Sequence, residues 1–176
     1  MKLKNEIIGT ILYFVVVMVA VFLIITYVGQ RTVVNGDSMV PCLNDGDNLI
    51  MDKLTYHFRD PERFEVVIFP SPLEEDKHFI KRVIGMPGET IQIIDEKVYI
   101  DGEELTTEVY GIEPIEEAGI AAEPYTLGED EYFVMGDNRP ISLDSRYEEV
   151  GPITRDEIEG RALVRIYPFN QMKVVK

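Results

Sequence analysis

A mostly apolar run without a charged residue extends from Ile7 to Val28. A helix of these 22 residues would be about 33 Å long, enough to cross a hydrocarbon core of roughly 30 Å. A cleaved secretory signal has a shorter apolar region and then a small-residue cleavage site, and Tyr27 to Arg31 offers none. A core helix that is apolar on every side does not suit so small a protein. The pattern therefore predicts an uncleaved, single-pass membrane anchor.

Beyond this run, short apolar stretches alternate with turn residues, which is typical of a mostly β domain. Alternating apolar positions on both sides of Asp95 to Lys97 predict a hairpin. The fold class expected is a mostly β sandwich or coiled sheet after one N-terminal transmembrane helix. The expected strands are Asp47 to Leu54, Phe64 to Phe69, Phe79 to Ile84, Glu131 to Met135 and Ala162 to Ile166.

The pattern divides the chain into residues 1–30, a cytoplasmic N-terminus with the anchor, and residues 31–176, an extracytoplasmic domain. The orientation follows from Lys2 and Lys4 before the span, against Arg31 after it. Residues 103–130 are acidic and weakly patterned, and they indicate an insertion or a mobile loop. A self-cleavage site after Ala122 is one interpretation of this stretch, and an ordinary exposed loop is the favoured one.

Composition narrows the possible partners. The 176 residues carry 17 basic and 32 acidic side chains and a net charge of −15, which argues against binding nucleic acid, since phosphate contacts need clustered Lys and Arg. The single cysteine, Cys42, excludes an intrachain disulfide and is expected to be a small buried hydrophobe. No Cys/His cluster has metal-ligand spacing, so neither a metal nor a cofactor is expected.

The candidate nucleophile is Ser38, which follows Val28 by ten residues and so lies at most about 35 Å from the end of the span. A serine needs a base, and a neutral lysine can serve when burial lowers its pKa. Lys81 shares a predicted strand face with Phe79 and Val83. Taken alone, that strand favours a lysine whose head reaches water. The alternative bases are His57 and His78, and neither lies in a Gly-rich or other recognisable catalytic motif.

The other motifs favour Lys81, because together they resemble the bacterial type I signal peptidases, in the lysine-using, Gram-positive-like form. The resemblance covers nearly the whole chain in the family's order. It is carried by the anchor, Ser38 to Pro41 (Ser-Met-Val-Pro), Gly46-Asp47, Lys81 to Glu89 and Gly136 to Arg146.

The resemblance implies a membrane-bound serine endopeptidase with Ser38 as nucleophile and Lys81 as general base. Its substrates would be exported preproteins with small residues before the cut. The supporting residues would be Ser142, which orients the Lys81 amine, the ion pair of Asp144 and Arg146, and Asp137 and Arg139 in the same turn. Shallow pockets would be lined by Val34, Met39, Leu43, Phe79 and Ile80, for which simple core packing is an equal alternative.

Two positions depart from the family pattern. Gly36 stands where some members have a serine that helps the oxyanion, and Cys42 stands where threonine is usual. The Ser38 amide would then be the named oxyanion donor. Two other functions stay open at this point: a cytoplasmic Ser-Lys autoprotease, and a non-catalytic signal-peptidase-like assembly factor.

Overall fold

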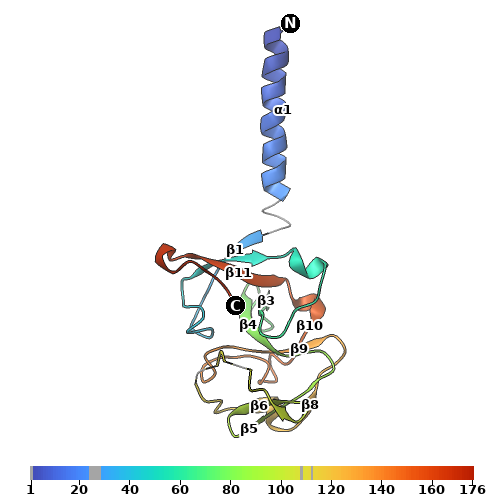
Figure 1. Ribbon diagram of the computed structural model, residues 1–176, viewed down its shortest axis with the longest axis vertical. Helices are drawn as coiled ribbons and strands as arrows, with labels where there is room; N and C mark the ends of the chain where they lie inside the picture. The colour runs from blue at the N-terminus through green and yellow to red at the C-terminus, as the bar shows by residue number, and fades with distance from the viewer. Residues whose placement is uncertain (1, 24–28, 108, 112) are drawn as a thin grey trace.

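The structure, a computed structural model, describes residues 2–23, 29–107, 109–111 and 113–176. One long helix, α1 (Lys2–Leu23), stands apart from a β domain that holds the rest of the chain (Figure 1). The C-terminus returns to the part of the domain nearest the helix. The prediction of a mostly β domain after the N-terminal helix is confirmed.

The expected membrane span is not supported by this structure. Among the described residues, no helix combines the length and the apolar character needed to cross a membrane. The predicted run from Ile7 to Val28 continues past the end of α1 at Leu23, and its residues 24–28 lie outside the described residues.

The larger sheet is antiparallel and joins segments that are far apart in sequence. Its strand order is β1-β2-β11-β3-β4-β9-β10, with β12 paired to β11. The bounds are β1 (Gly29–Val33), β2 (Asn48–Asp52), β3 (Val66–Pro70), β4 (His78–Gly85), β9 (Glu131–Met135), β10 (Ile153–Thr154), β11 (Gly160–Tyr167) and β12 (Lys173–Val174). Because β4 lies between β3 and β9, both of its edges are paired and its side chains are buried along most of its length.

A smaller sheet lies at the end of the domain away from α1 (Figure 1). Its order is β7-β6-β5-β8, from β5 (Thr90–Ile94), β6 (Lys97–Ile100), β7 (Glu103–Glu104) and β8 (Tyr125–Thr126). The β5–β6 hairpin turns at Asp95 and Glu96, as the alternating pattern predicted. The described residues also form four short 3-10 helices: η2 (Thr55–His57), η3 (Gly119–Ala122), η4 (Arg155–Glu157) and η5 (Phe169–Gln171).

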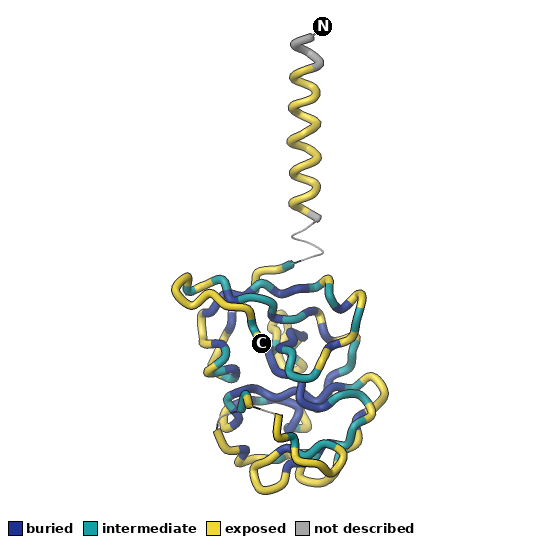
Figure 2. The backbone as a smooth tube through the Cα atoms, in the orientation of Figure 1, coloured by how far each residue is buried: buried dark blue, intermediate teal, exposed yellow. Residues whose placement is uncertain are grey.

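Buried positions concentrate on the central strands, while the loops are exposed (Figure 2). In the part of the chain that the structure describes, three apolar clusters make up the core, and β4 contributes to each of them: Ile80 to the first, Ile84 to the second and Val83 to the third. Burying an apolar side chain stabilises the folded state by about 1.5 to 3 kcal/mol relative to leaving the side chain exposed. This central strand is therefore a rigid support for any side chain it presents.

Much of the acidic stretch 103–130, expected as an insertion or a mobile loop, is packed against the domain. It contains β7, η3 and β8, and it buries Ile115, Ala121 and Leu127 in the second cluster. The segment considered for self-cleavage lies in η3, where the Ile120 amide donates to the Arg146 carbonyl at 2.8 Å. The residues before the considered cut therefore have a 3-10 helical conformation, unlike an extended substrate.

Candidate active site

The central contact of the site joins Lys81 to Ser38. Lys81 lies in β4 opposite Val67 of β3, and its Nζ donates to the Ser38 Oγ at 2.8 Å. This is hydrogen-bond distance for a base and the hydroxyl that it would deprotonate. The contact spans 43 positions of sequence, so the fold, and not local structure, brings the two side chains together.

The surroundings of Lys81 favour its neutral form. The residue is only 4% exposed, and this burial lowers the pKa of its amine to about 8, against the opposing charge of Asp144. The neighbouring Arg146 lowers the pKa further, and Asp137 raises it. The amine also lies 5.0 Å from the centre of the Phe79 ring, on the strand face that the alternation predicted. Near pH 8 a large fraction of this lysine can accept a proton.

A tight turn presents Ser38 to that amine. Gly36 has φ +86°, a left-handed conformation that favours glycine, and its N–H donates to Asp45 Oδ1 at 2.7 Å. On the other side, the Asn138 amide donates to the Ser38 carbonyl at 3.0 Å. The Ser38 amide has no acceptor among the described residues, so it is available to an oxyanion.

Asp144 and Arg146 form the expected ion pair, and both side chains are fully buried. Arg146 Nε donates to Asp144 Oδ1 at 2.8 Å and its Nη2 donates to Oδ2 at 3.0 Å. The same Nη2 reaches the carbonyls of Arg139 and Ser142. The pair therefore holds the backbone of the segment that follows β9.

Ser142 lies near the Ser38 backbone, at Gly136, but makes no hydrogen bond to Lys81. Its hydroxyl is buried and has no partner among the described residues. It packs on Gly136, where a Cβ would come within 2.2 Å of Ser142 Oγ and 2.5 Å of the Ser38 carbonyl oxygen. Gly136 thus allows Ser38 and Ser142 to approach each other.

Asp137 and Arg139 do not pair with each other. Asp137 accepts from Arg82, at 2.7 Å from Nε and 2.6 Å from Nη2, with both side chains buried. Arg139 is buried too, and its Nε donates to the Gly136 carbonyl at 3.0 Å. Arg82 was not among the predicted site residues. Its place between the apolar residues Ile80 and Ile84 on one strand face was the available signal for a buried ion pair.

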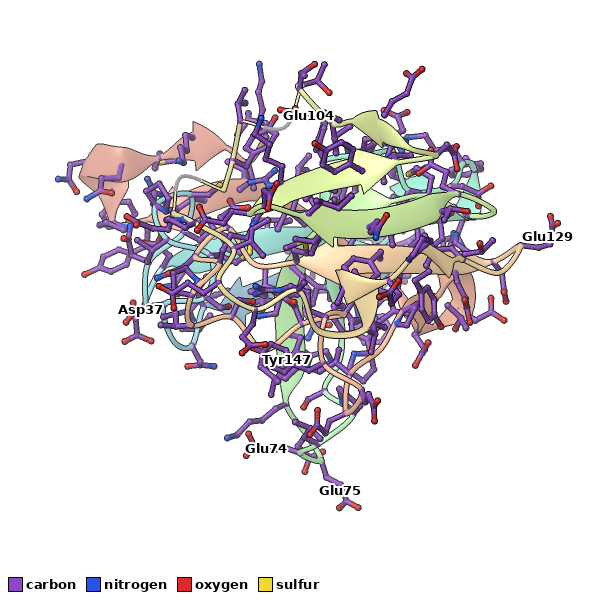
Figure 3. The ribbon with its side chains drawn as sticks, turned by 90° about the horizontal axis from the view of Figure 1, so that it is seen from below. Asp37, Glu74, Glu75, Glu104, Glu129 and Tyr147 are labelled. Carbon is purple, nitrogen blue, oxygen red and sulfur yellow. The ribbon has the colours of Figure 1, made fainter. Side chains whose placement is uncertain are left out.

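A groove of about 320 Å³ opens beside Ser38 and Lys81. Four of the five predicted pocket residues line it, namely Val34, Met39, Phe79 and Ile80. The prediction for the fifth, Leu43, is wrong: this residue is not part of the groove lining, and it is 0% exposed within the first core cluster. Asp37 and Glu74 give the groove an acidic rim, and both project outward from the domain (Figure 3).

The histidine alternatives are not placed as bases for Ser38. His78 lines the groove, but its Nε2 lies 3.2 Å from Glu159. His57 belongs to η2 and lines a different cavity, beside Arg155. Cys42 is half-buried against the first cluster, and no group of three His, Cys, Asp or Glu within the described residues could hold a metal.

Known proteins resemble this chain over most of its length. The family model "Signal peptidase, peptidase S26" matches residues 7–167. A probable signal peptidase I-2 of Synechocystis is 38% identical over 148 residues, which are 81% of this chain and 65% of that protein. The signal peptidase I of Bacillus licheniformis is 33% identical over 180 residues, covering 97% of this chain and 94% of that protein. A solved signal peptidase I from Enterococcus faecalis V583 is 36% identical, covers 58% of this chain and 97% of its own, and has a TM-score of 0.47.

A serine hydroxyl against a buried amine, on a mostly β domain with a groove beside the two groups, fits the class of serine peptidases. The chain belongs to the signal peptidase family, peptidase S26. The resemblance stated from the motifs is confirmed, and removal of signal peptides by a serine endopeptidase is the activity of this family.

Proposed function

We propose that this protein removes signal peptides from exported preproteins, with Ser38 as the nucleophile and Lys81 as the general base. The observation that carries the proposal is the 2.8 Å contact between Lys81 Nζ and Ser38 Oγ, in a place where burial lowers the pKa of the lysine to about 8. A lysine in water would hold its proton at neutral pH and could not act in this way.

The reaction proceeds in two halves. Neutral Lys81 takes the proton of Ser38 as Oγ attacks the scissile carbonyl carbon. The resulting oxyanion accepts a hydrogen bond from the Ser38 N–H. The lysine then gives its proton to the leaving amine, which departs as the mature protein. Lys81 next deprotonates a water that attacks the ester carbonyl, and the signal peptide is released as Ser38 regains its proton.

Ser142 orients the amine during these steps. Its buried hydroxyl lies near the Ser38 backbone and has no partner among the described residues. An unpaired buried hydroxyl is costly enough to favour any partner that comes within reach. When Lys81 takes the Ser38 proton, Ser142 accepts a hydrogen bond from the charged amine. The Asp144–Arg146 pair braces the segment that carries Ser142.

The substrate lies extended in the groove beside Ser38. Backbone hydrogen bonds to the groove wall hold it in place, and side-chain pockets accept small, Ala-like residues before the cut. The apolar lining of Val34, Met39, Phe79 and Ile80 supports this preference. No nucleic acid takes part, in keeping with the net charge of −15.

The domain works at the extracytoplasmic surface of a membrane, held by the apolar run Ile7 to Val28 with Lys2 and Lys4 on the cytoplasmic side. Two features support this location. The apolar side chains of α1 are exposed around the helix, and Tyr167, Phe169 and Met172 expose apolar surface on the domain. The η5 segment that includes Phe169 lies at the end of the domain nearest α1 (Figure 1).

Two measurements test this location. Resistance of the full chain to alkaline carbonate extraction, together with protease accessibility of the domain from outside intact cells, is the expected result. A carbonate-soluble or externally protected domain would favour the cytoplasmic autoprotease instead.

Incubation of the full chain in detergent with a preprotein tests the activity. Mass determination should find a new N-terminus directly after a small residue. Ser38→Ala and Lys81→Ala should each abolish this product while the circular dichroism of the protein is unchanged. Full cleavage by Lys81→Ala would contradict the assignment. A protein that cleaves nothing and reacts with no serine-directed inhibitor would favour the non-catalytic assembly factor.

A further inference from the structure

Three buried arginines lie behind the candidate catalytic pair. Arg82, Arg139 and Arg146 are the three largest fully buried side chains among the described residues. Arg82 follows Lys81 in β4 and holds Asp137, while Arg146 holds Asp144. A buried guanidinium is stable only where its N–H groups and its faces have suitable partners. The residues that pack on these arginines therefore influence the geometry of the candidate site.

The cover comes from the acidic stretch that was expected to be a loop. We name the described residues 109–111 and 113–122 the cover segment. Tyr110 places its ring centre 3.7 Å from Arg82 Cζ. A Cβ on Gly111 would lie 2.3 Å from Arg139 Cζ, so the backbone here is in close contact with that guanidinium. The Glu117 carbonyl accepts from Arg146 Nη1 at 3.1 Å. The cover segment thus touches all three arginines.

Arg82 is the arginine most directly tied to the lysine. Its Nε and Nη2 bind Asp137, and its Nη1 donates to the Phe64 carbonyl at 2.7 Å. Tyr110 closes one face of the guanidinium, and Phe64 in turn packs on the Tyr110 ring, with centroids 5.5 Å apart. Because the guanidinium is desolvated, a ring at this distance stabilises it more than an exposed ring would.

We propose that Tyr110 is a positioning residue for peptide hydrolysis: its ring holds Arg82 on Asp137 and thereby fixes Lys81 against Ser38. The inference rests on the proposed function, since it takes Ser38 and Lys81 as the reacting groups. Adjacent residues of one paired strand cannot shift independently, so loosening Arg82 moves the backbone of Lys81. The negative charge of Asp137 also raises the pKa of Lys81 directly. If Arg82 moves away from Asp137, the carboxylate is less neutralised and favours the protonated amine more strongly.

Tyr110 is not a member of the three core clusters of the described residues. Its removal should therefore affect the site more than the fold. A matched control is Tyr125, which packs against the second cluster beside η3 but takes part in no cation–π contact of the described residues. Tyr125→Leu removes a similar aromatic area without exposing an arginine.

The experiment compares Tyr110→Leu, Tyr110→Phe and Tyr125→Leu in the full chain. Tyr110→Leu keeps bulk but removes the aromatic face from a desolvated cation. It should lower kcat about tenfold with KM within about twofold, because the ring acts on the position of the base and not on substrate binding. The acid limb of its pH–rate profile should move to higher pH. Tyr110→Phe keeps the face and should retain the parent kcat and profile. Tyr125→Leu should lower the urea midpoint without moving the profile.

A second readout separates this inference from the proposed function. A pH titration of the Lys81 13Cε resonance reports the pKa of its amine whether or not the protein cleaves a preprotein. Tyr110→Leu should raise that pKa toward the ordinary lysine value, and Tyr110→Phe should not. An unchanged Lys81 titration in Tyr110→Leu, or an equal change in Tyr110→Phe, would overturn the positioning role. A parent protein that fails to cleave would count against the proposed function alone.

Discussion

Lys81 and Arg82 are neighbours in β4 and both are buried, but only Arg82 is paired with a carboxylate. The Arg82 guanidinium binds the Asp137 carboxylate through two hydrogen bonds. The Lys81 amine binds the neutral hydroxyl of Ser38. Because successive residues of a strand face opposite sides, one short segment supplies a paired guanidinium on one face and a lysine with a lowered pKa on the other.

Cleavage should depend on pH through the Lys81 amine. Since burial lowers the pKa of this amine to about 8, kcat/KM should rise up to about pH 8 and level off above it, because the base must be neutral. Rates measured between pH 6 and 10 test this. A rate that is flat between pH 6 and 9 would contradict a lysine base.

The same burial should make the native protein less stable than a variant without the amine. The pKa of about 8 in the folded protein lies below the ordinary lysine value of 10.5, so the unfolded chain binds more protons between these values. The destabilisation is then fully present below about pH 8 and diminishes as pH rises toward 10.5. Lys81→Met should raise the free energy of unfolding at pH 7 by roughly 1 to 3 kcal/mol, as measured in urea. Equal stabilisation at pH 7 and pH 10.5 would argue against this cause.

Breaking the Arg82–Asp137 pair should be costly. Asp137→Asn leaves the buried guanidinium without its carboxylate, and the expected loss of stability is about 3 to 5 kcal/mol. The exposed pair of Lys97 and Glu104 is the control, and Lys97→Ala should leave the urea midpoint unchanged. Similar midpoints for the two variants would mean that the buried pair contributes little.

Gly136→Ala should separate the catalytic groups. The added Cβ would meet the Ser38 carbonyl oxygen and the Ser142 hydroxyl, so the turn that presents Ser38 has to shift. A displacement of about 1 Å is expected to lower kcat on the order of 100-fold. Gly128→Ala is the control, since its Cβ would meet only the flexible Glu131 side chain. Parent-like kcat in Gly136→Ala would show that the turn tolerates the methyl group.

Ile80 and Leu43 should differ in what they control. Ile80 lines the groove, so Ile80→Ala should widen the range of residues accepted before the cut. Leu43 is a core residue, so Leu43→Ala should lower stability by about 2 to 5 kcal/mol with cleavage specificity unchanged. A library of preprotein variants, with cleavage sites determined by mass, distinguishes the two effects. A specificity change in Leu43→Ala would restore it as a pocket residue.

The strand pattern made much of the fold predictable. A short apolar run bounded by turn residues located β4, which is buried along most of its length, and apolar alternation located the β5–β6 hairpin. The stretch 103–130 was harder to predict. It packs on buried arginines and on the second cluster, so its order depends on tertiary partners that local composition does not reveal.

The site was predictable to a similar extent. Ser38 and Lys81 were named from motifs, and the fold brings them into contact. The partner of Asp137 and the place of Leu43 were not predictable, because both depend on which strand faces meet across the sheet. Nor did the motifs reveal Tyr110, whose contact with Arg82 joins separate segments of the chain.

Acylation of Ser38 by a serine-directed acylating inhibitor, followed by mass spectrometry from pH 6 to 10, tests the central claim most directly. The protein should acquire one adduct, on Ser38, at a rate that rises with a single midpoint near pH 8, where the Lys81 amine loses its proton. Lys81→Met should react at least about 100-fold more slowly with no such midpoint. An adduct on another residue, or an unchanged rate and midpoint in Lys81→Met, would contradict the account.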